Sequence, residues 1–200
     1  MKVIGLTGGI ASGKSTVSML LRNKGAAIID ADEISREILR PGKPAWKAVI
    51  DCFGRGILCD NENIDRKKLG SIVFSDSAEL EKLNRITHPA IMEEIKKRLD
   101  YYRKKREKIV VIDAALLLEL GLNSMVDEVW LVAVDEKTQL KRLLARERGM
   151  SYKDAMNRIK AQMPLEEKVK MADKIIDNSG NIEETGRKID ELWRDIIRQC

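Results

Sequence analysis

The chain has 200 residues, and its 37 basic and 32 acidic residues give a net charge of +5. This length suits one compact domain with room for a small inserted lobe, and a composition of 44% hydrophobic and 34% charged residues excludes a disordered chain. Acids and bases are interspersed along the helical patterns, which indicates solvated faces rather than a nucleic-acid-binding surface, and no apolar stretch approaches the length of a membrane span.

Short apolar runs alternate with helical patterns in the N-terminal part of the chain. An apolar run bounded by glycines predicts a buried strand, and apolar residues at helical spacing before a glycine predict a helix that ends there. The predicted elements are a strand at Val3–Leu6, a helix at Gly13–Lys24 ended by Gly25, a strand at Ala27–Ile29 and a helix at Ile34–Leu39.

The middle of the chain, from about Pro44 to Arg106, has helical patterns and no clear strand. Candidate helices are Ile64–Phe74 and Glu79–Ile86, and Pro89 suits the first turn of a third helix. An all-helical segment between two strand-containing parts predicts an inserted lobe for a substrate.

Strands and helices alternate again in the C-terminal part. The predicted strands are Val110–Ile112, Val129–Val134 and Lys174–Ile176, and the predicted helices are Glu136–Arg148, Ser151–Gln162, Glu166–Ala172 and Glu183–Arg198. Strands separated by helices require crossover connections, so the sequence predicts an α/β fold with a five-stranded parallel sheet between helical layers.

A glycine-rich segment from Gly8 to Ser15 matches the pattern Gly-x-x-x-x-Gly-Lys-Ser/Thr between a predicted strand and a predicted helix. Such a loop presents backbone N–H groups and a helix N-terminus to phosphates, with Lys14 on the β- and γ-phosphates and the Ser15 hydroxyl on Mg²⁺. The alternative, a chance surface turn, lacks this strand and helix context. The residues expected to bind ATP are Gly9, Ala11, Ser12, Gly13, Lys14, Ser15 and Thr16.

The chain lacks the Asn-Lys-x-Asp guanine clamp of switch GTPases, and its length suits a small-molecule kinase. Such a kinase needs a carboxylate near the acceptor hydroxyl, and Asp32 follows the second strand at the sheet edge where ligands bind. A helix cap is the alternative role for Asp32. Asp113 ends the third strand, where it either holds a Mg²⁺-bound water or is a solvent-facing strand end.

Basic residues on the predicted helix Glu136–Arg148 favour a lid that closes over ATP. Arg142 and Arg146 are one helical turn apart and share a face. An ordinary exposed basic face is the alternative. His88 and Pro89 read on local grounds as a plain helix start.

Several motifs together resemble the dephospho-coenzyme A kinase family over nearly the whole chain. They are Gly5-Leu6-Thr7-Gly8-Gly9-Ile10 through Thr16, Asp30-Ala31-Asp32 with Arg36, Ile64-Asp65-Arg66 with Leu69 and Val73-Phe74, Leu83-Asn84 with His88-Pro89-Ala90-Ile91, and Arg142, Arg146, Arg158, Gln162, Ala172-Asp173 and Asp177-Asn178. Two positions depart from the family pattern: Met92 stands where arginine is common, and Ala115 stands where proline is common.

The resemblance implies a phosphate-loop three-layer sandwich with a core (about 1–43, 107–140 and 172–200), a helical coenzyme-binding lobe (about 44–106) and a helical lid (about 141–171). It implies transfer of the ATP γ-phosphoryl to the ribose 3′-hydroxyl of dephospho-coenzyme A, with Mg²⁺. The implied catalytic residues are Asp32 as proton acceptor, Lys14 and Arg142. Arg142, Arg146 and Asn178 are implied in ATP binding, and Thr7, Asp32, Arg36, His88, Ile91 and Leu116 in acceptor binding.

Two other functions fit the same loop: a kinase for another small hydroxyl or nucleoside monophosphate, and a nucleotide-dependent binding module. The cysteines Cys52, Cys59 and Cys200 lack zinc-ligand spacing, and their odd number without an export signal predicts a reducing, cytoplasmic location. We expect ATP and dephospho-coenzyme A as partners, no nucleic acid or membrane, and a monomer or weak homo-oligomer.

Overall fold

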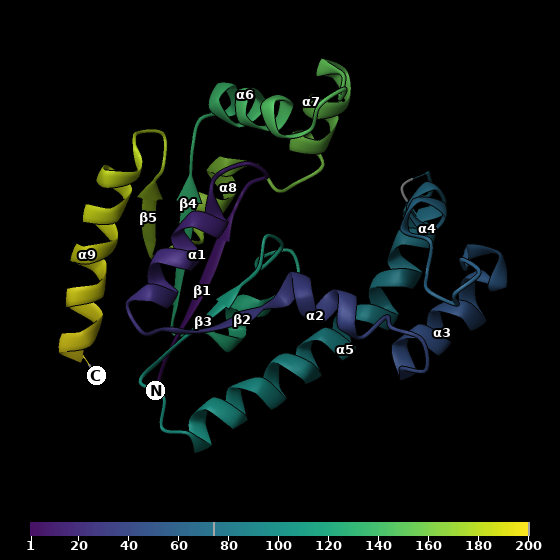
Figure 1. The fold of residues 1–200 in the computed structure, drawn as a ribbon, viewed down its shortest axis with the longest axis horizontal. Helices are drawn as coiled ribbons and strands as arrows, with labels where there is room; N and C mark the ends of the chain where they lie inside the picture. Colours follow the sequence, from purple (N-terminus) through teal and green to yellow (C-terminus); the bar gives the residue numbers. More distant parts are fainter. Residues whose placement is uncertain (74, 200) are drawn as a thin grey trace. The chain divides into compact units, whose positions relative to one another are not determined.

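Five parallel strands form one sheet in the computed structural model, which describes residues 1–73 and 75–199 (Figure 1). The strands lie in the order β2-β3-β1-β4-β5. Their bounds are β1 Lys2–Gly8, β2 Ala27–Asp30, β3 Ile109–Asp113, β4 Glu128–Ala133 and β5 Lys174–Asp177. Every pair of neighbours is parallel, so the chain crosses over between strands, and the predicted five-stranded parallel sheet is confirmed.

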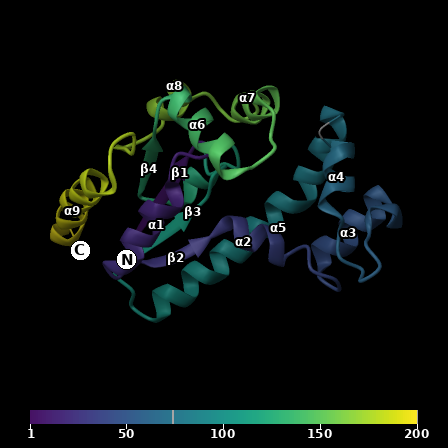
Figure 2. The same ribbon diagram turned by 45° about the horizontal axis from the view of Figure 1, so that its top comes forward.

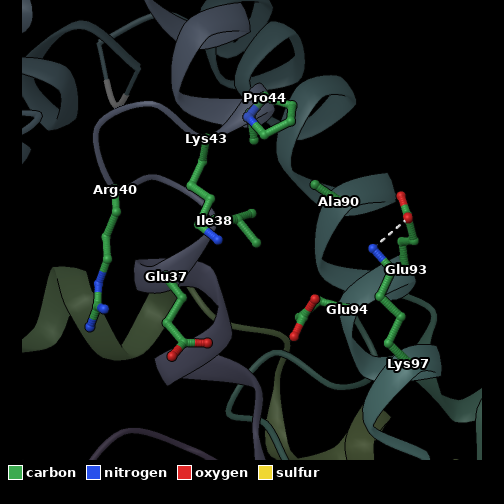
Figure 3. A pocket seen from close by; sticks show the side chains of 10 residues that line it. Glu37, Ile38, Arg40, Lys43, Pro44, Ala90, Glu93, Glu94 and Lys97 are labelled. Atoms are coloured by element: carbon green, nitrogen blue, oxygen red, sulfur yellow. Dashed lines mark ion pairs between the residues drawn. The ribbon is translucent and has the colours of Figure 1, made fainter. Parts of the chain in front are cut away.

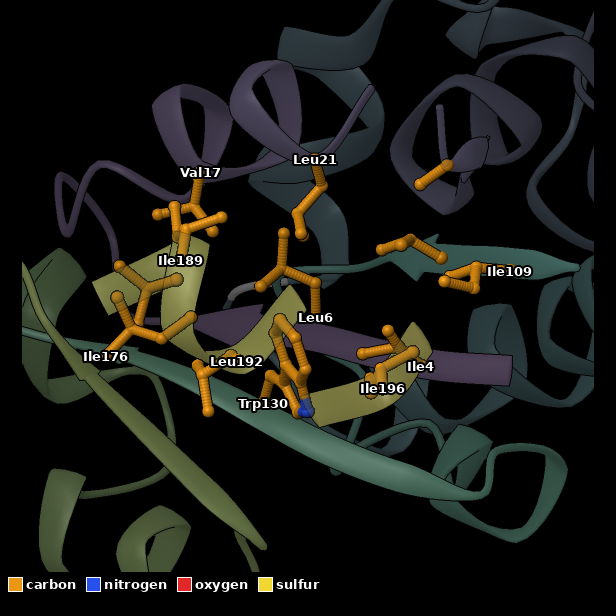
Figure 4. Packing of buried hydrophobic residues seen from close by; sticks show 13 residues of the cluster. Ile4, Leu6, Val17, Leu21, Ile109, Trp130, Ile176, Ile189, Leu192 and Ile196 are labelled. Carbon is orange, nitrogen blue, oxygen red and sulfur yellow. The ribbon is translucent and has the colours of Figure 1, made fainter. Parts of the chain in front are cut away.

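One face of the sheet is covered by α1 (Lys14–Asn23) and α9 (Ile182–Gln199). Alternate residues of β1 and β4 point into this layer, where Ile4, Leu6 and Trp130 are fully buried (Figure 4). The indole N–H of Trp130 donates to Glu128 Oε2 at 3.0 Å, so burying this large side chain leaves no polar atom unpaired. The core between the helices and the sheet therefore fixes the position from which the glycine-rich loop starts.

The opposite face of β1 carries Gly5 and Thr7. A Cβ on Gly5 would lie 2.7 Å from Leu117 Cδ1, so the segment after β3 packs directly against the strand there. The Thr7 hydroxyl donates to Ala115 O at 3.2 Å, and Lys168 of α8 (Leu165–Lys170) donates to the same carbonyl at 3.3 Å. Helices thus cover both faces, as a three-layer arrangement requires.

A second set of helices, residues 31–100, forms its own compact unit, and residues 1–30 and 101–200 form the other. It contains α2 (Ala31–Glu37), α3 (Pro44–Phe53), α4 (Arg66–Val73) and most of α5 (Ser77–Lys104). One cluster of its buried side chains consists of Val49, Ile57, Leu69 and Val73, joined by partly buried Leu39, Phe53, Ile64, Ile72, Leu80, Leu83 and Ile86. The division of the chain into core, coenzyme lobe and lid stays a functional prediction.

The predicted helix break before Pro89 is wrong, because α5 runs through that residue from Ser77 to Lys104. A proline inside a helix removes one backbone hydrogen bond and destabilises the helix by about 3 kcal/mol. Burial along one face of α5 offsets this loss, at about 1.5–3 kcal/mol for each large aliphatic side chain. The buried residues on that face are Thr87, Ile91, Ile95 and Leu99.

Smaller differences lie at element ends. α2 begins at Ala31 rather than at Ile34, directly after β2. β1, β2, β3 and β5 extend one or two residues beyond the predicted runs, whereas β4 begins one residue earlier than predicted and ends at Ala133, one residue before the predicted end. Phe74, which closes a predicted helix and belongs to a family-like motif, lies outside the described residues, as does Cys200. Cys52 and Cys59 are free and exposed. Over the described ranges, no helix has the length and apolar character needed to cross a bilayer.

Candidate active site

The glycine-rich segment forms a tight loop between the end of β1 and the first residue of α1, Lys14. Gly13 and Ala11 adopt left-handed backbone conformations, with φ of +87° and +57°. The loop closes on itself because Ser12 N donates to Gly9 O at 3.1 Å and Thr16 N donates to Gly13 O at 2.9 Å. Left-handed residues next to a helix N-terminus turn backbone N–H groups toward one side, which creates a concave anion site.

Lys14 pairs with Asp113 at the carboxyl end of β3. Both side chains are largely buried, with exposed fractions of 13% and 9%. Strand register sets this meeting, because Asp113 lies opposite Leu6 of β1 on one side and Asp30 of β2 on the other. The sheet therefore gathers two carboxylates and the loop lysine at one edge, where ligands bind in open parallel sheets.

Asn178 joins the loop to the segment after β5. Its Nδ2 donates to Ser12 O at 2.7 Å, and its Oδ1 accepts from the buried Thr185 hydroxyl at 2.7 Å. Arg142 of α6 (Glu136–Arg146) donates to Asn178 O at 2.9 Å. A Cβ on Gly13 would lie 2.0 Å from Asn178 Nδ2, so this contact requires glycine there. Two of the predicted ATP-binding residues, Arg142 and Asn178, thus meet beside the loop.

Arg146 and Arg158 share one carboxylate, that of Glu147. Arg146 donates to Glu147 Oε1 at 3.1 Å, and Arg158 of α7 (Tyr152–Lys160) donates to Glu147 Oε2 at 2.7 Å. The hydrogen bond from Arg146, with the charge of Arg158, holds the pKa of Glu147 below its usual range. α6 and α7 lie side by side (Figure 2), and this carboxylate ties their ends together.

The predicted acceptor residues divide between the two units. Thr7 and Leu116 belong to the sheet unit, where Thr7 is buried and Leu116 is 42% exposed. The helical unit holds Asp32 and Arg36, both exposed on α2, and Ile91, which is buried on α5. His88 is partly buried on α5, and this burial lowers its pKa, which favours the neutral imidazole.

A cavity of about 320 Å³ lies within the helical unit, between the segment after α2 and α5 (Figure 3). Ile38 and Lys43 point into it from one side, and Glu94 faces them from α5. Its full lining is Glu37, Ile38, Arg40, Lys43, Pro44, Ala45, Ala90, Glu93, Glu94 and Lys97. None of the predicted acceptor residues is among these lining residues, so the cavity does not bear on their predicted role in acceptor binding.

Sequence reasoning assigned no site role to three side chains that contact the loop or its neighbours. Gln162 accepts from Ile10 N at 2.7 Å, and Gln139 donates to Ile10 O at 3.1 Å. Lys168 is 1% exposed and pairs with Glu119 at 2.9 Å. Gln162 appears among the family-like residues, whereas Gln139 and Lys168 look like ordinary polar positions of a surface helix and carry no motif.

The strand order, the loop between β1 and α1, and the lysine–carboxylate pair at the sheet edge define a phosphate-loop protein of the small-kinase type. The family model for dephospho-CoA kinase matches residues 2–184. A dephospho-CoA kinase of Carboxydothermus hydrogenoformans is 54% identical over 189 residues, covering 94% of this chain and 91% of that protein.

Solved structures agree with this match. A dephospho-CoA kinase from Campylobacter jejuni has a TM-score of 0.73 at 29% identity, covering 98% of each chain. A Thermus thermophilus protein has a TM-score of 0.83 at 29% identity, covering 97% of each chain. The chain belongs to the dephospho-CoA kinase family. The predicted family, and with it the predicted activity of an ATP-dependent kinase acting on dephospho-CoA, is confirmed.

Proposed function

We propose that Lys14, Arg142 and Asp32 carry the transfer of the ATP γ-phosphoryl to the ribose 3′-hydroxyl of dephospho-CoA. The Lys14–Asp113 pair at the mouth of the loop is the observation on which this proposal rests most heavily. Lys14 is already desolvated and held at the sheet edge, so its charge is placed where the β- and γ-phosphates enter. Phosphoryl transfer depends on such positioning and charge stabilisation more than on covalent chemistry.

Asp32 is proposed to accept the proton of the attacking hydroxyl. It lies in the first turn of α2, two residues after Asp30, whose strand partner is Asp113. Asp32 is therefore two residues along the chain from the carboxyl end of β2. Arg142 is proposed to stabilise charge on the transferred group, because its guanidinium is fixed beside Asn178 and the loop.

The acceptor is proposed to contact Thr7, Arg36, His88, Ile91 and Leu116, and the nucleotide to contact Gly9, Ala11, Ser12, Gly13, Ser15, Thr16, Arg146 and Asn178. Among them Ile91 is buried, so it acts by shaping the acceptor side of α5. Arg146, paired with Glu147, is proposed to exchange that carboxylate for a phosphate.

Mg²⁺ is the proposed metal, held by the Ser15 hydroxyl and, through water, by Asp113. These are hard oxygen donors of the kind Mg²⁺ prefers, and Ser15 is exposed at the start of α1. The described residues hold no cluster of three or more His, Cys, Asp or Glu side chains around a metal position, which fits an ion carried mainly by phosphate and water. The chemistry that bound Mg²⁺ supplies is neutralisation of charge on the phosphate oxygens.

Cytoplasmic location and a monomeric or weakly self-associating state are also proposed. The exposed free thiols of Cys52 and Cys59 suit a reducing compartment. Cell fractionation and sedimentation of the purified chain test these two statements separately.

A coupled assay of ADP release with dephospho-CoA tests the proposed reaction, with the product identified by mass and by the position of the new phosphate. The expected product is CoA carrying the phosphate on the ribose 3′-hydroxyl. Nucleoside monophosphates and simple sugars serve as competing acceptors, and dephospho-CoA should exceed them widely in kcat/KM. Equal use of another acceptor, or transfer to another hydroxyl, would contradict the proposal.

A further inference from the structure

Two glutamines hold opposite sides of one residue of the phosphate loop. The Ile10 N–H donates to Gln162 Oε1 at 2.7 Å, and the Ile10 carbonyl accepts from Gln139 Nε2 at 3.1 Å. Gln139 lies in the first turns of α6, and Gln162 follows the C-terminal end of α7. One residue of the loop is therefore bound both to α6 and to the segment that follows α7.

Gly9 makes room for this arrangement. A Cβ on Gly9 would lie 2.2 Å from Gln139 Nε2 and 3.7 Å from Gln162 Oε1. Both side chains therefore pass over the loop where it has no side chain of its own. A larger residue at Gly9 would push the Gln139 amide aside. The side chain of Gln139 can move, but its hydrogen bond to Ile10 O would be lost.

The residue after Ile10 explains why the loop needs support. Ala11 has a φ of +57°, a left-handed conformation that residues with a Cβ adopt infrequently. Fixing the Ile10 peptide groups on both sides restricts the loop to the turn in which Ala11 is left-handed. The Ser12 N–H donates back to Gly9 O, and the N–H groups that follow it then face the side on which phosphate is expected to bind.

We propose that Gln139 and Gln162 are positioning residues that hold the phosphate loop in its nucleotide-binding shape and couple that shape to α6 and α7. The inference rests on the proposed role of the loop in ATP binding. The two side chains act with opposite polarity: Gln162 is needed as an acceptor and Gln139 as a donor. Neither side chain is assigned a contact with the phosphates or the acceptor.

Opposite polarity allows a matched test with Gln162→Glu and Gln139→Glu. Each variant adds one carboxylate beside the same residue, so both suffer a comparable repulsion of ATP. The carboxylate at 162 still accepts from the Ile10 N–H, whereas the carboxylate at 139 has no proton to donate and faces the Ile10 carbonyl. We expect kcat/KM for ATP to be about tenfold lower for Gln139→Glu than for Gln162→Glu, the ratio expected when one hydrogen bond that holds the loop in its binding shape is lost.

Two exposed positions on the same helices provide controls. Lys137→Ala on α6 and Asn157→Ala on α7 should leave kcat/KM for ATP within about twofold of the parent chain. Gln139→Ala and Gln162→Ala should each raise KM for ATP several-fold, with KM for dephospho-CoA and the thermal midpoint close to those of the controls. Their double variant should lose less than the product of the two single effects, because both act on one residue.

The proposal is overturned if Gln162→Glu is as impaired as Gln139→Glu, or if the alanine variants match the controls. It is also overturned if the loss of activity follows a fall in thermal midpoint, because the glutamines would then support the fold in general. Failure of the proposed function is distinguishable, since the parent chain would then show no ATP-dependent turnover against which to compare the variants.

Discussion

The two compact units hold their predicted functional side chains in different ways. In the sheet unit, Lys14, Asp113 and Asn178 are engaged with partners inside the protein, and most of their surface is buried. In the helical unit, Asp32 and Arg36 are exposed on one short helix. A site that is built into a folded network is preorganised, but every change to it also disturbs the fold. Changes in the exposed set disturb less buried surface, so they are expected to alter turnover more than stability.

The largest expected effect separates chemistry from stability. Asp32→Asn keeps the shape of the side chain but removes the proton acceptor, and loss of a general base lowers turnover by about 10²–10⁴-fold. We expect kcat to fall by this amount, with ATP affinity and the thermal midpoint close to the parent values. Steady-state kinetics and ATP titration measure the two quantities.

Glu33→Gln is the matched control for that variant, because Glu33 is the neighbouring exposed carboxylate in the same first turn of α2. Its kcat should stay within about threefold of the parent. If Asp32→Asn keeps near-parent turnover, Asp32 does not accept the proton and another group must be sought.

Lys14→Ala should show the opposite behaviour, with both activity and stability reduced. Loss of one charge that stabilises the transferred group lowers kcat by about 10²–10³-fold. The variant also leaves Asp113 without its lysine in a site where the carboxylate side chain is 9% exposed, so the thermal midpoint should fall. Kinetics and thermal unfolding on the same preparation test both statements.

Lys24→Ala is the control, because Lys24 also pairs with a carboxylate, Asp190, but at a more exposed position on the far end of α1. Exposed ion pairs contribute about 0–1 kcal/mol, so this variant should change little in either measurement. Equal effects of the two substitutions would remove the special role given to Lys14.

Asn178→Ala should have an intermediate effect on the same unit. It removes the donor to Ser12 O and leaves the buried Thr185 hydroxyl only its longer hydrogen bond to Asn181 O at 3.3 Å, which destabilises the protein by about 1–3 kcal/mol. Because Ser12 belongs to the loop, KM for ATP should rise several-fold as well. Denaturant unfolding and ATP-dependent kinetics provide the readouts.

Asn181→Ala gives the comparison for Asn178→Ala. Asn181 Oδ1 accepts from Glu184 N at 2.9 Å at the start of α9, so its loss removes a helix cap worth about 1 kcal/mol without touching the loop. A rise in KM for ATP in this variant would show that the Asn178 effect is a general consequence of instability.

The difference between local spacing and long-range contacts explains how far the sequence alone predicts the structure. Apolar runs and glycines predict all five strands, and the loop motif predicts Lys14 and Gly13, because these features depend on local spacing. Asn178, Gln139 and Gln162 meet the loop only through the sheet order and the path of α6 and α7, so their partners are not visible in local patterns.

The error at Pro89 has the same origin. Local rules place proline at a helix start, but the burial of Ile91, Ile95 and Leu99 along α5 outweighs one missing hydrogen bond. Long-range packing decides whether the helix continues through Pro89. A sequence pattern shows which face of the helix is apolar, but it does not show how much free energy the burial of that face contributes. The Arg146–Glu147 pairing likewise depends on how α6 ends rather than on the basic pattern that predicted a lid.

The smallest expected effect concerns the helical unit and its single histidine. Burial lowers the pKa of His88 in the folded chain, whereas an unfolded chain has a histidine pKa near the ordinary value of about 6.5. Above that value both states are neutral and pH has no effect through this group. As pH falls below it, the unfolded state binds the proton first, so the free energy of unfolding decreases until the folded ring is protonated too.

His88→Gln should therefore lose less stability than the parent between pH 7.5 and 5.5, by about a few tenths of a kcal/mol because the ring is partly exposed. Urea unfolding of both chains at the two pH values measures the difference, and parallel losses would show that the environment of His88 does not favour its neutral form.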